Sequence, residues 1–208
     1  MPETDSFLQA IPLGGLGEIG KNMMAIRYKR TIVLIDSGLM FPEDELLGID
    51  VVIPDITYLT ENREMVKAIF LTHGHEDHVG ALPYVLRHLD VPVYGGRLTL
   101  GIVAEKLKES GLSTSMLKEV KPRDRIKIGS ITAEFFRMSH SIPDAMGIAL
   151  HTPLGIVLHT GDFKLDQTPV DGEMVDFRKI SELGEKGVLL MFSDSTNSTR
   201  PEIGRAHV

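Results

Sequence analysis

Four potential metal ligands lie close together in the sequence, directly after an apolar segment. The segment Val66–Thr72 reads VKAIFLT and is followed by His73, His75, Asp77 and His78 in the spacing H-x-H-x-D-H. Alternate side chains of an extended stretch point to the same side, so His73 and His75 are expected to face one way. Asp77 and His78 then lie at the expected start of a helix. Four ligands spread in this way do not fit one tetrahedral ion easily, which predicts two metal ions that share the site.

The residue types narrow the choice of metal. The sequence contains no cysteine, so a metal must be held by His, Asp or Glu, and a disulfide or a thiolate nucleophile is excluded. Neutral imidazoles with carboxylates suit Zn²⁺, with Mn²⁺ or Fe as alternatives. A surface histidine cluster in a polar loop is the competing interpretation, and the apolar strand directly before the motif argues against it.

Composition places the chain among globular proteins. Its 208 residues are 42% hydrophobic and 25% charged, which is enough for one domain with a core. No apolar run approaches the ~20 residues of a membrane span, and the segment MPETDSFLQA lacks the features of a signal peptide. We therefore expect a cytoplasmic protein with no membrane partner. The net charge of −7 argues weakly against nucleic acid, although bound cations would neutralise part of the acidity.

Short apolar segments alternate with helical patterns, which predicts a layered α/β architecture. Helices are predicted from His78 to Leu89 and over Leu98–Ser110, the second one ended by Gly111. Strands are predicted at five apolar segments, namely Thr31–Ile35, Val66–Thr72, Ile131–Arg137, Gly155–Thr160 and Gly187–Ser193. Each predicted strand ends at or near a His or Asp, which in layered folds is where polar site residues gather.

The H-x-H-x-D-H motif resembles the signature of the metallo-β-lactamase fold hydrolases, whose fold is an αββα sandwich. Three further positions fit ordered motifs of that family: Asp36 in LIDSG, His140 in MSHSIPD and Asp162 in HTGDFK. The resemblance implies one zinc ion on the first three histidines and a second on the Asp-His pair, with one bridging carboxylate. The implied ligands are His73, His75 and His140, then Asp77 and His78, with Asp162 as the bridge.

The same resemblance implies catalytic roles for Asp77, His78 and Asp36. Two cations about 3.5–4 Å apart would lower the pKa of a water and clamp the attacking and leaving oxygens. Asp36 would hold a ligand histidine by its second nitrogen. The alternative for Asp36 is an ordinary strand-ending residue in a D-S-G turn.

Longer phrases resemble the ribonuclease J family, a β-CASP branch of the superfamily. They are IPLGGLGEIGKN, FPEDELLGIDVVIPD, LTHGHEDHVGALPY, RMSHSIPD, HTGDFKLDQTPVDG and SDSTNSTRP, between Ile11 and Pro201. The resemblance implies a ribonuclease with two Zn²⁺ per subunit, Mn²⁺ being possible, that cleaves RNA as a 5′→3′ exonuclease and endonuclease. Its roles would be mRNA decay and rRNA maturation, and its assembly a homodimer or homotetramer. The family also implies a calcium ion near Gly48 and Asp50, where the alternative is a turn before a strand.

The resemblance also predicts how the chain is organised. Residues 1–201 would be the first part of a metallo-β-lactamase domain, with the β-CASP insertion and the C-terminal part missing, and this piece alone would be inactive. Residues 202–208 read EIGRAHV, a translation of a common sequencing adapter, and are predicted to be a non-native tail. Two other functions stay open: a non-catalytic partner subunit of ribonuclease J type, and a small-molecule hydrolase of the glyoxalase II type.

One motif is expected to mislead. Gly15, Gly17 and Gly20 fit the nucleotide-binding pattern G-x-G-x-x-G, but Asn22 and a predicted strand follow instead of a helix. A tight turn between two strands near the site is the better interpretation. His159 is expected to be an ordinary strand histidine, with a role close to the metal ligands as the alternative.

Overall fold

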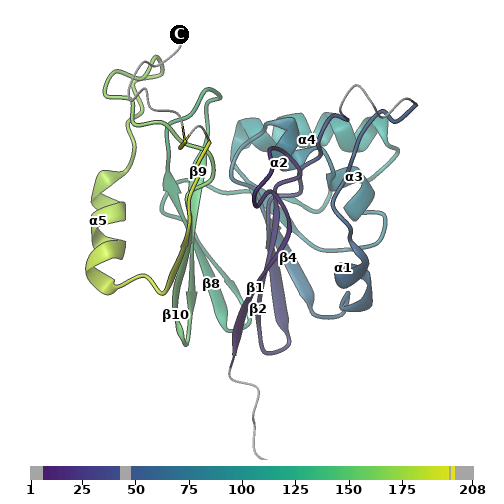
Figure 1. Cartoon of the computed structure of the whole chain (residues 1–208), viewed down its shortest axis with the longest axis horizontal. Helices are drawn as coiled ribbons and strands as arrows, with labels where there is room; N and C mark the ends of the chain where they lie inside the picture. Colours follow the sequence, from purple (N-terminus) through teal and green to yellow (C-terminus); the bar gives the residue numbers. More distant parts are fainter. Residues whose placement is uncertain (1–6, 43–47, 197, 200–208) are drawn as a thin grey trace, which may run out of the picture.

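The computed structural model describes residues 7–42, 48–196 and 198–199, and these form two sheets that pack face to face between layers of helices (Figure 1). The first sheet has the order β1 (Leu8–Gly14), β2 (Met23–Tyr28), β3 (Thr31–Ile35), β4 (Val66–Phe70), β5 (Val93–Gly95), β6 (Leu117–Glu119). The second has the order β11 (Leu190–Phe192), β10 (Gly155–His159), β9 (Met146–Thr152), β8 (Ile131–Arg137), β7 (Arg125–Ile128).

The helices cover the two outer faces. Those next to the first sheet are α1 (Thr57–Glu61), α2 (Glu76–Val79), α3 (Leu82–Val85) and α4 (Arg97–Glu109), and α5 (Phe177–Lys186) lies outside the second sheet. The first sheet is antiparallel from β1 to β3 and parallel from β3 to β6, because helical crossovers follow β3, β4 and β5. The predicted αββα sandwich is therefore confirmed.

The core has one apolar layer at each of the three contacts between layers. Along β3, Ile32 and Leu34 pack toward the helices, whereas Val33 and Ile35 pack toward the second sheet. Both faces of this strand are buried, which explains why its sequence is continuously apolar rather than alternating. The third layer joins the second sheet to α5, where Leu183 is fully buried.

The predicted elements are largely present, with three corrections. The predicted helix from His78 to Leu89 is two short helices, α2 and α3, because Pro83 lacks the N–H that a continuous helix needs and lies in the first turn of the second one. The predicted strand Gly187–Ser193 is shortened to β11, which pairs over three residues with β10. The strand predicted at Val66–Thr72 ends at Phe70, so that Leu71 and Thr72 already belong to the loop that enters the site.

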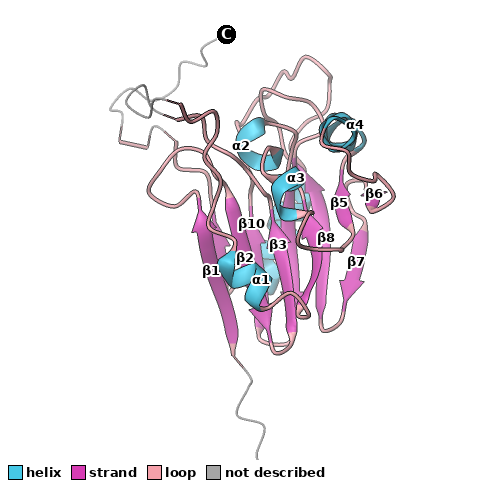
Figure 2. Ribbon diagram, turned by 90° about the vertical axis from the view of Figure 1, so that its right-hand side faces the viewer, coloured by secondary structure: helices cyan, strands magenta, loops and turns pink. Residues whose placement is uncertain are grey.

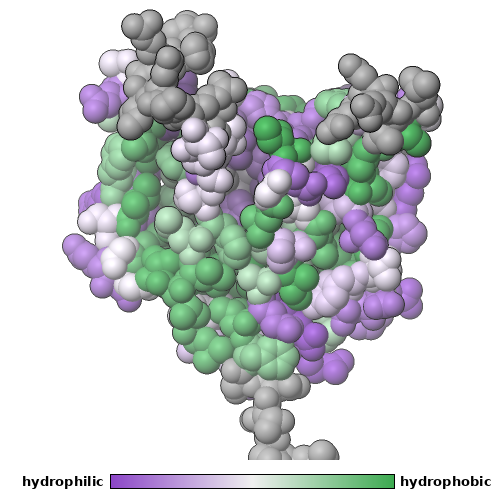
Figure 3. Space-filling model, viewed as in Figure 1, coloured by the Kyte–Doolittle hydropathy of each residue, from purple (hydrophilic) through white to green (hydrophobic). Residues whose placement is uncertain are grey.

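One end of the sandwich collects the loops that follow β3, β4, β8 and β10, with α2 among them (Figure 2). An apolar surface lies over the outermost strands of the two sheets (Figure 3), where Leu189, Leu190 and Met191 are each at least 40% exposed. Within the described part of the chain, no helix combines the length and apolar character needed to span a membrane.

Candidate metal centre

Three histidines from two loops form the first ligand cluster. His73 and His75 follow β4, and His140 follows β8 of the other sheet. The His75 Nδ1 atom lies 3.1 Å from His73 Nε2 and 3.3 Å from His140 Nε2. One nitrogen from each ring fits within 4.8 Å of the others, so the three could hold one ion.

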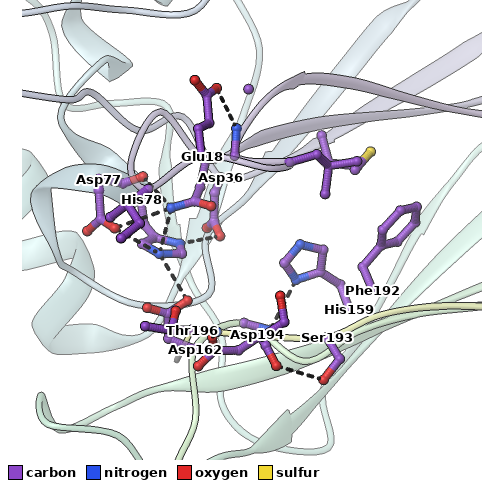
Figure 4. Close-up of a pocket in the computed structure, with 18 of the residues that line it drawn as sticks. Glu18, Asp36, Asp77, His78, His159, Asp162, Phe192, Ser193, Asp194 and Thr196 are labelled. Carbon is purple, nitrogen blue, oxygen red and sulfur yellow. Dashed lines mark hydrogen bonds and ion pairs between the residues drawn. The ribbon is translucent and has the colours of Figure 1, made fainter. Parts of the chain in front are cut away.

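A second cluster shares His73 and adds His78 from α2 and Asp162 from the loop after β10. His78 Nε2 lies 3.3 Å from Asp162 Oδ1 and 3.6 Å from Asp77 Oδ2 (Figure 4). The other oxygen of Asp162 lies 3.7 Å from His140 Nε2, so this carboxylate reaches both clusters. The six residues predicted as metal ligands therefore lie in one site.

Asp36 holds the His78 ring in place from the buried side of the site. Its Oδ2 lies 2.8 Å from His78 Nδ1 and accepts the hydroxyl proton of Thr72, while its Oδ1 accepts the Thr72 N–H. The residue is buried and has φ +61°, a backbone conformation that few residues other than glycine adopt. With Nδ1 of His78 bonded to this carboxylate, Nε2 is the nitrogen that faces Asp77 and Asp162.

The charges around His78 are strongly coupled. Burial lowers the pKa of this imidazole, but the carboxylates of Asp36 and Asp162 outweigh it and raise the pKa to about 10. Burial would raise the pKa of Asp36, and the charge and hydrogen bond of His78 lower it overall. Burial and the neighbouring His78 charge lower the pKa of His73, so that ring is neutral. A metal ion that binds His78 must displace a proton from it.

A pocket of about 650 Å³ opens beside the second cluster. The glycine-rich loop before β2 forms one wall, and residues 193–196 after β11 form the opposite wall. Among the described residues that line it, none is Lys or Arg, whereas carboxylates include Glu18, Asp36 and Asp194. Negative charge on a ligand in this pocket must therefore be balanced by bound cations.

Two residues that sequence reasoning did not assign to the site contact it. Asn22 places its side-chain Nδ2 3.0 Å from the Asp77 carbonyl oxygen and 3.1 Å from His78 Nε2. His159 lines the pocket, and its Nδ1 accepts the Gly161 N–H at 3.0 Å. Asn22 lies two residues after Gly20, the last glycine of the glycine-rich motif, and this position alone does not distinguish it from an ordinary turn residue.

The remaining predictions have different outcomes. Gly48 and Asp50 are exposed, and among the described residues neither ligand cluster includes Asp50, so the calcium site stays a prediction. The glycine-rich motif forms the predicted turn between two strands, β1 and β2. The tail predicted at 202–208 lies outside the described residues.

Residues 16–182 match the family profile of the Metallo-beta-lactamase superfamily. The chain belongs to this superfamily. It is 51% identical over 199 residues to a protein named Ribonuclease J from Synechocystis, an alignment that covers 94% of this chain and 31% of the relative. It is 49% identical to Ribonuclease J of Thermus thermophilus and 49% identical to Ribonuclease J2 of Bacillus subtilis, each over 93% of this chain and 35% of the relative.

The predicted similarity to ribonuclease J is confirmed, and the chain spans about a third of the length of these curated relatives. Among solved structures, a protein of unknown function from Enterococcus faecalis superposes with a TM-score of 0.70 at 20% identity, over 95% of this chain and 52% of the other. The Rm3 metallo-beta-lactamase superposes with a TM-score of 0.59 at 15% identity, over 91% and 78%. These two likenesses concern the superfamily fold alone.

Proposed function

We propose that this chain carries the metal centre of a zinc-dependent ribonuclease that hydrolyses RNA phosphodiester bonds. The activity would be 5′→3′ exonucleolytic and endonucleolytic, and would serve mRNA decay and rRNA maturation. The observation that supports this most is the pair of ligand clusters that share His73 in a chain about half identical to proteins named ribonuclease J. Membership of the superfamily implies a divalent metal, and the imidazole and carboxylate donors of the two clusters fit one.

The proposed ligands form two subsites. The first subsite is His73, His75 and His140, and the second subsite is Asp77 and His78, with Asp162 between the two. Imidazoles with carboxylates fit Zn²⁺, and Mn²⁺ is the alternative. Two such ions, when bound, lower the pKa of a water molecule and stabilise charge on phosphoryl oxygens.

The protein's own residues orient the ligands and shape the pocket. Asp36 directs Nε2 of His78 toward the second subsite, and Thr72 holds Asp36 with two hydrogen bonds. The lining residues include hydroxyl side chains of Ser195 and Thr196 but no described Lys or Arg. Such a pocket can position a phosphodiester by hydrogen bonds, while the charge of the phosphate is balanced by the metal ions.

RNA cleavage by the whole protein that carries this chain tests the proposal, since the chain spans about a third of its relatives' length. The zinc-loaded protein is expected to degrade a 5′-monophosphorylated RNA, and His75→Ala and Asp77→Ala to lose cleavage by about 100-fold or more while still binding RNA. Hydrolysis of a thioester but not of RNA would favour the glyoxalase II type. RNA binding without cleavage by the zinc-loaded wild type would favour the non-catalytic partner subunit.

The proposal extends to assembly and location. We expect the whole protein to be a homodimer or homotetramer in the cytoplasm, with RNA as its partner. Light scattering coupled to size-exclusion chromatography measures the first property, and cell fractionation the second. A calcium ion near Asp50 is a separate part of the proposal, which calcium titration of Asp50→Ala tests.

A further inference from the structure

The glycine-rich turn that failed as a nucleotide-binding motif ends at a residue that reaches the metal centre. Asn22 closes the loop between β1 and β2, and its side chain enters the site next to α2. Its Nδ2 donates to the carbonyl oxygen of Asp77 at 3.0 Å and to the Asp77 carboxylate at 3.3 Å. The same nitrogen lies 3.1 Å from Nε2 of His78.

The backbone of Asn22 also makes hydrogen bonds to the surrounding loops. The Asn22 N–H donates to the Asp77 carbonyl at 3.0 Å, and the Asn22 carbonyl accepts the Gly38 N–H at 2.9 Å. Asn22 is thereby held to the turn after Asp36 on one side and to α2 on the other. One residue thus joins three loops of the site.

Glycines provide the space for this contact. A Cβ atom on Gly15 would lie 2.5 Å from Asn22 Oδ1, and one on Gly38 would lie 1.6 Å from the Asp77 carbonyl oxygen. Gly17 lies in the same turn and also has positive φ, but a Cβ atom there would meet nothing within 4 Å. A side chain at Gly15 would therefore collide with Asn22, and one at Gly38 would collide with Asp77. At Gly17 there is space for a side chain, and only the positive φ favours glycine.

We propose that Asn22 is a positioning residue of the second subsite, whose carboxamide holds the Asp77 carboxylate beside His78. The inference rests on the two-metal centre proposed above. The contacts with Asp77 do not use Nε2 of His78, so they remain available when an ion binds that nitrogen. Loss of such a supporting hydrogen bond typically weakens metal binding by about 10–100-fold.

Zinc titration of the metal-free full chain by calorimetry tests this. The wild type is expected to bind two ions, and Asp77→Ala identifies which binding step belongs to the second subsite. Asn22→Ala is expected to weaken that same step about 10–100-fold and to leave the other step unchanged. Asn22→Leu keeps the branched shape of the side chain and removes the amide. It is expected to weaken the same step, and it serves as the second variant in case Asn22→Ala does not fold.

Two controls separate positioning from general damage. Asn62→Ala removes a comparable amide, which donates to the Tyr58 carbonyl on α1, and should change neither step. Gly15→Ala is expected to weaken the second step by displacing the carboxamide, whereas Gly17→Ala strains the same turn and should not. Circular dichroism of the metal-free variants confirms that each is folded.

The outcomes are distinct. Two unchanged binding steps in folded Asn22→Ala and Asn22→Leu would overturn the role of Asn22 and leave the metal centre intact. Equal weakening of both steps would also overturn it, since a positioning role predicts a selective loss. A wild-type chain that binds fewer than two zinc ions would overturn the two-metal centre itself, and the inference with it.

Discussion

Asp36 controls which nitrogen of His78 carries a proton. Its Oδ2 accepts from His78 Nδ1, so that Nε2 is the nitrogen that gives up its proton to an ion. In Asp36→Asn the new NH₂ group can donate to Nδ1, which favours the tautomer with the proton on Nε2 and so opposes metal binding. We expect zinc affinity at the second subsite to fall about 10–100-fold, measured by competition with a chelating dye.

Asparagine suits this substitution because, like aspartate, it tolerates the positive φ of Asp36 better than most residues. Asp55→Asn is the control, because the Asp55 carboxylate accepts the N–H of the neighbouring Thr57, outside the site. Unchanged zinc affinity in Asp36→Asn would show that the carboxylate does not set the tautomer of His78.

The separation between residues decided which parts of the site could be predicted. His73, His75, Asp77 and His78 are local in sequence, so their spacing alone indicated a shared site. Asn22 contacts Asp77 across 55 positions, and its residue type is common in turns. No local pattern distinguishes such an asparagine from an ordinary turn residue.

At the level of elements, Asp144 fixes the loop that carries His140. Its Oδ2 accepts the Leu98 N–H at 2.9 Å in the first turn of α4, and its φ is +72°. A Cβ atom on Gly96 would lie 2.0 Å from this carboxylate oxygen. We expect Gly96→Ala to displace Asp144, to destabilise the chain by about 1–3 kcal/mol and to weaken zinc binding at the first subsite.

Gly101→Ala is the matched control on the same helix. A Cβ atom at Gly101 meets nothing within 4 Å, so alanine there should stabilise α4 by up to about 1 kcal/mol. Urea unfolding and zinc titration of both variants measure the two effects. Equal behaviour of the two variants would contradict the proposed role of Asp144.

Helix α5 is joined to the second sheet by a buried ion pair. Lys179 Nζ lies 2.8 Å from Glu134 Oε1, and Glu134, on β8, also lies 2.7 Å from His151 Nε2. Burial would raise the pKa of Glu134, but hydrogen bonds from Lys179 and His151 lower it overall below its ordinary value. Lys179→Met should therefore cost about 3 kcal/mol at neutral pH, because it leaves a buried carboxylate with fewer partners.

The pH dependence of this loss follows from the lowered pKa. The contribution of Glu134 is present above its unfolded-state pKa and is lost as the pH falls through its folded-state value. The difference in unfolding free energy between wild type and Lys179→Met should therefore shrink from about pH 5 downward. Urea unfolding across this range measures it, and a difference that grows on acidification would contradict the assignment.

Local patterns predicted the central elements better than the peripheral ones. The strands at Thr31–Ile35 and Ile131–Arg137 have their predicted bounds, since both are rich in apolar residues and lie between two neighbouring strands of a sheet. The three-residue strands β5 and β6 were not predicted, because pairing with a neighbour defines them more than their own composition does.

At the scale of the whole molecule, the metal centre lies where the two sheets meet. His73 lies in the loop after β4 and His78 in α2, both beside the first sheet, whereas His140 and Asp162 follow strands of the second. Sequence patterns could indicate that these residues follow strands. They could not indicate which strand ends meet across the two sheets, because that depends on apolar packing across the whole core. An ion bound to ligands from both sheets must be released on unfolding, so binding and stability are linked.

Zinc is therefore expected to stabilise the whole chain. At a free zinc concentration about 100 times the dissociation constant, one site adds about 2.7 kcal/mol to the free energy of unfolding. For a chain of this size, that raises the Tm by roughly 5–10 °C relative to the protein in EDTA, as measured by scanning calorimetry.

His140→Ala and Asp162→Ala should each lose much of this increase in Tm, because each removes a ligand that follows a strand of the second sheet. His88→Ala, at an exposed histidine outside both clusters, should retain it. If zinc raised the Tm of all three variants by the same amount, the ion would not join the two sheets through these ligands.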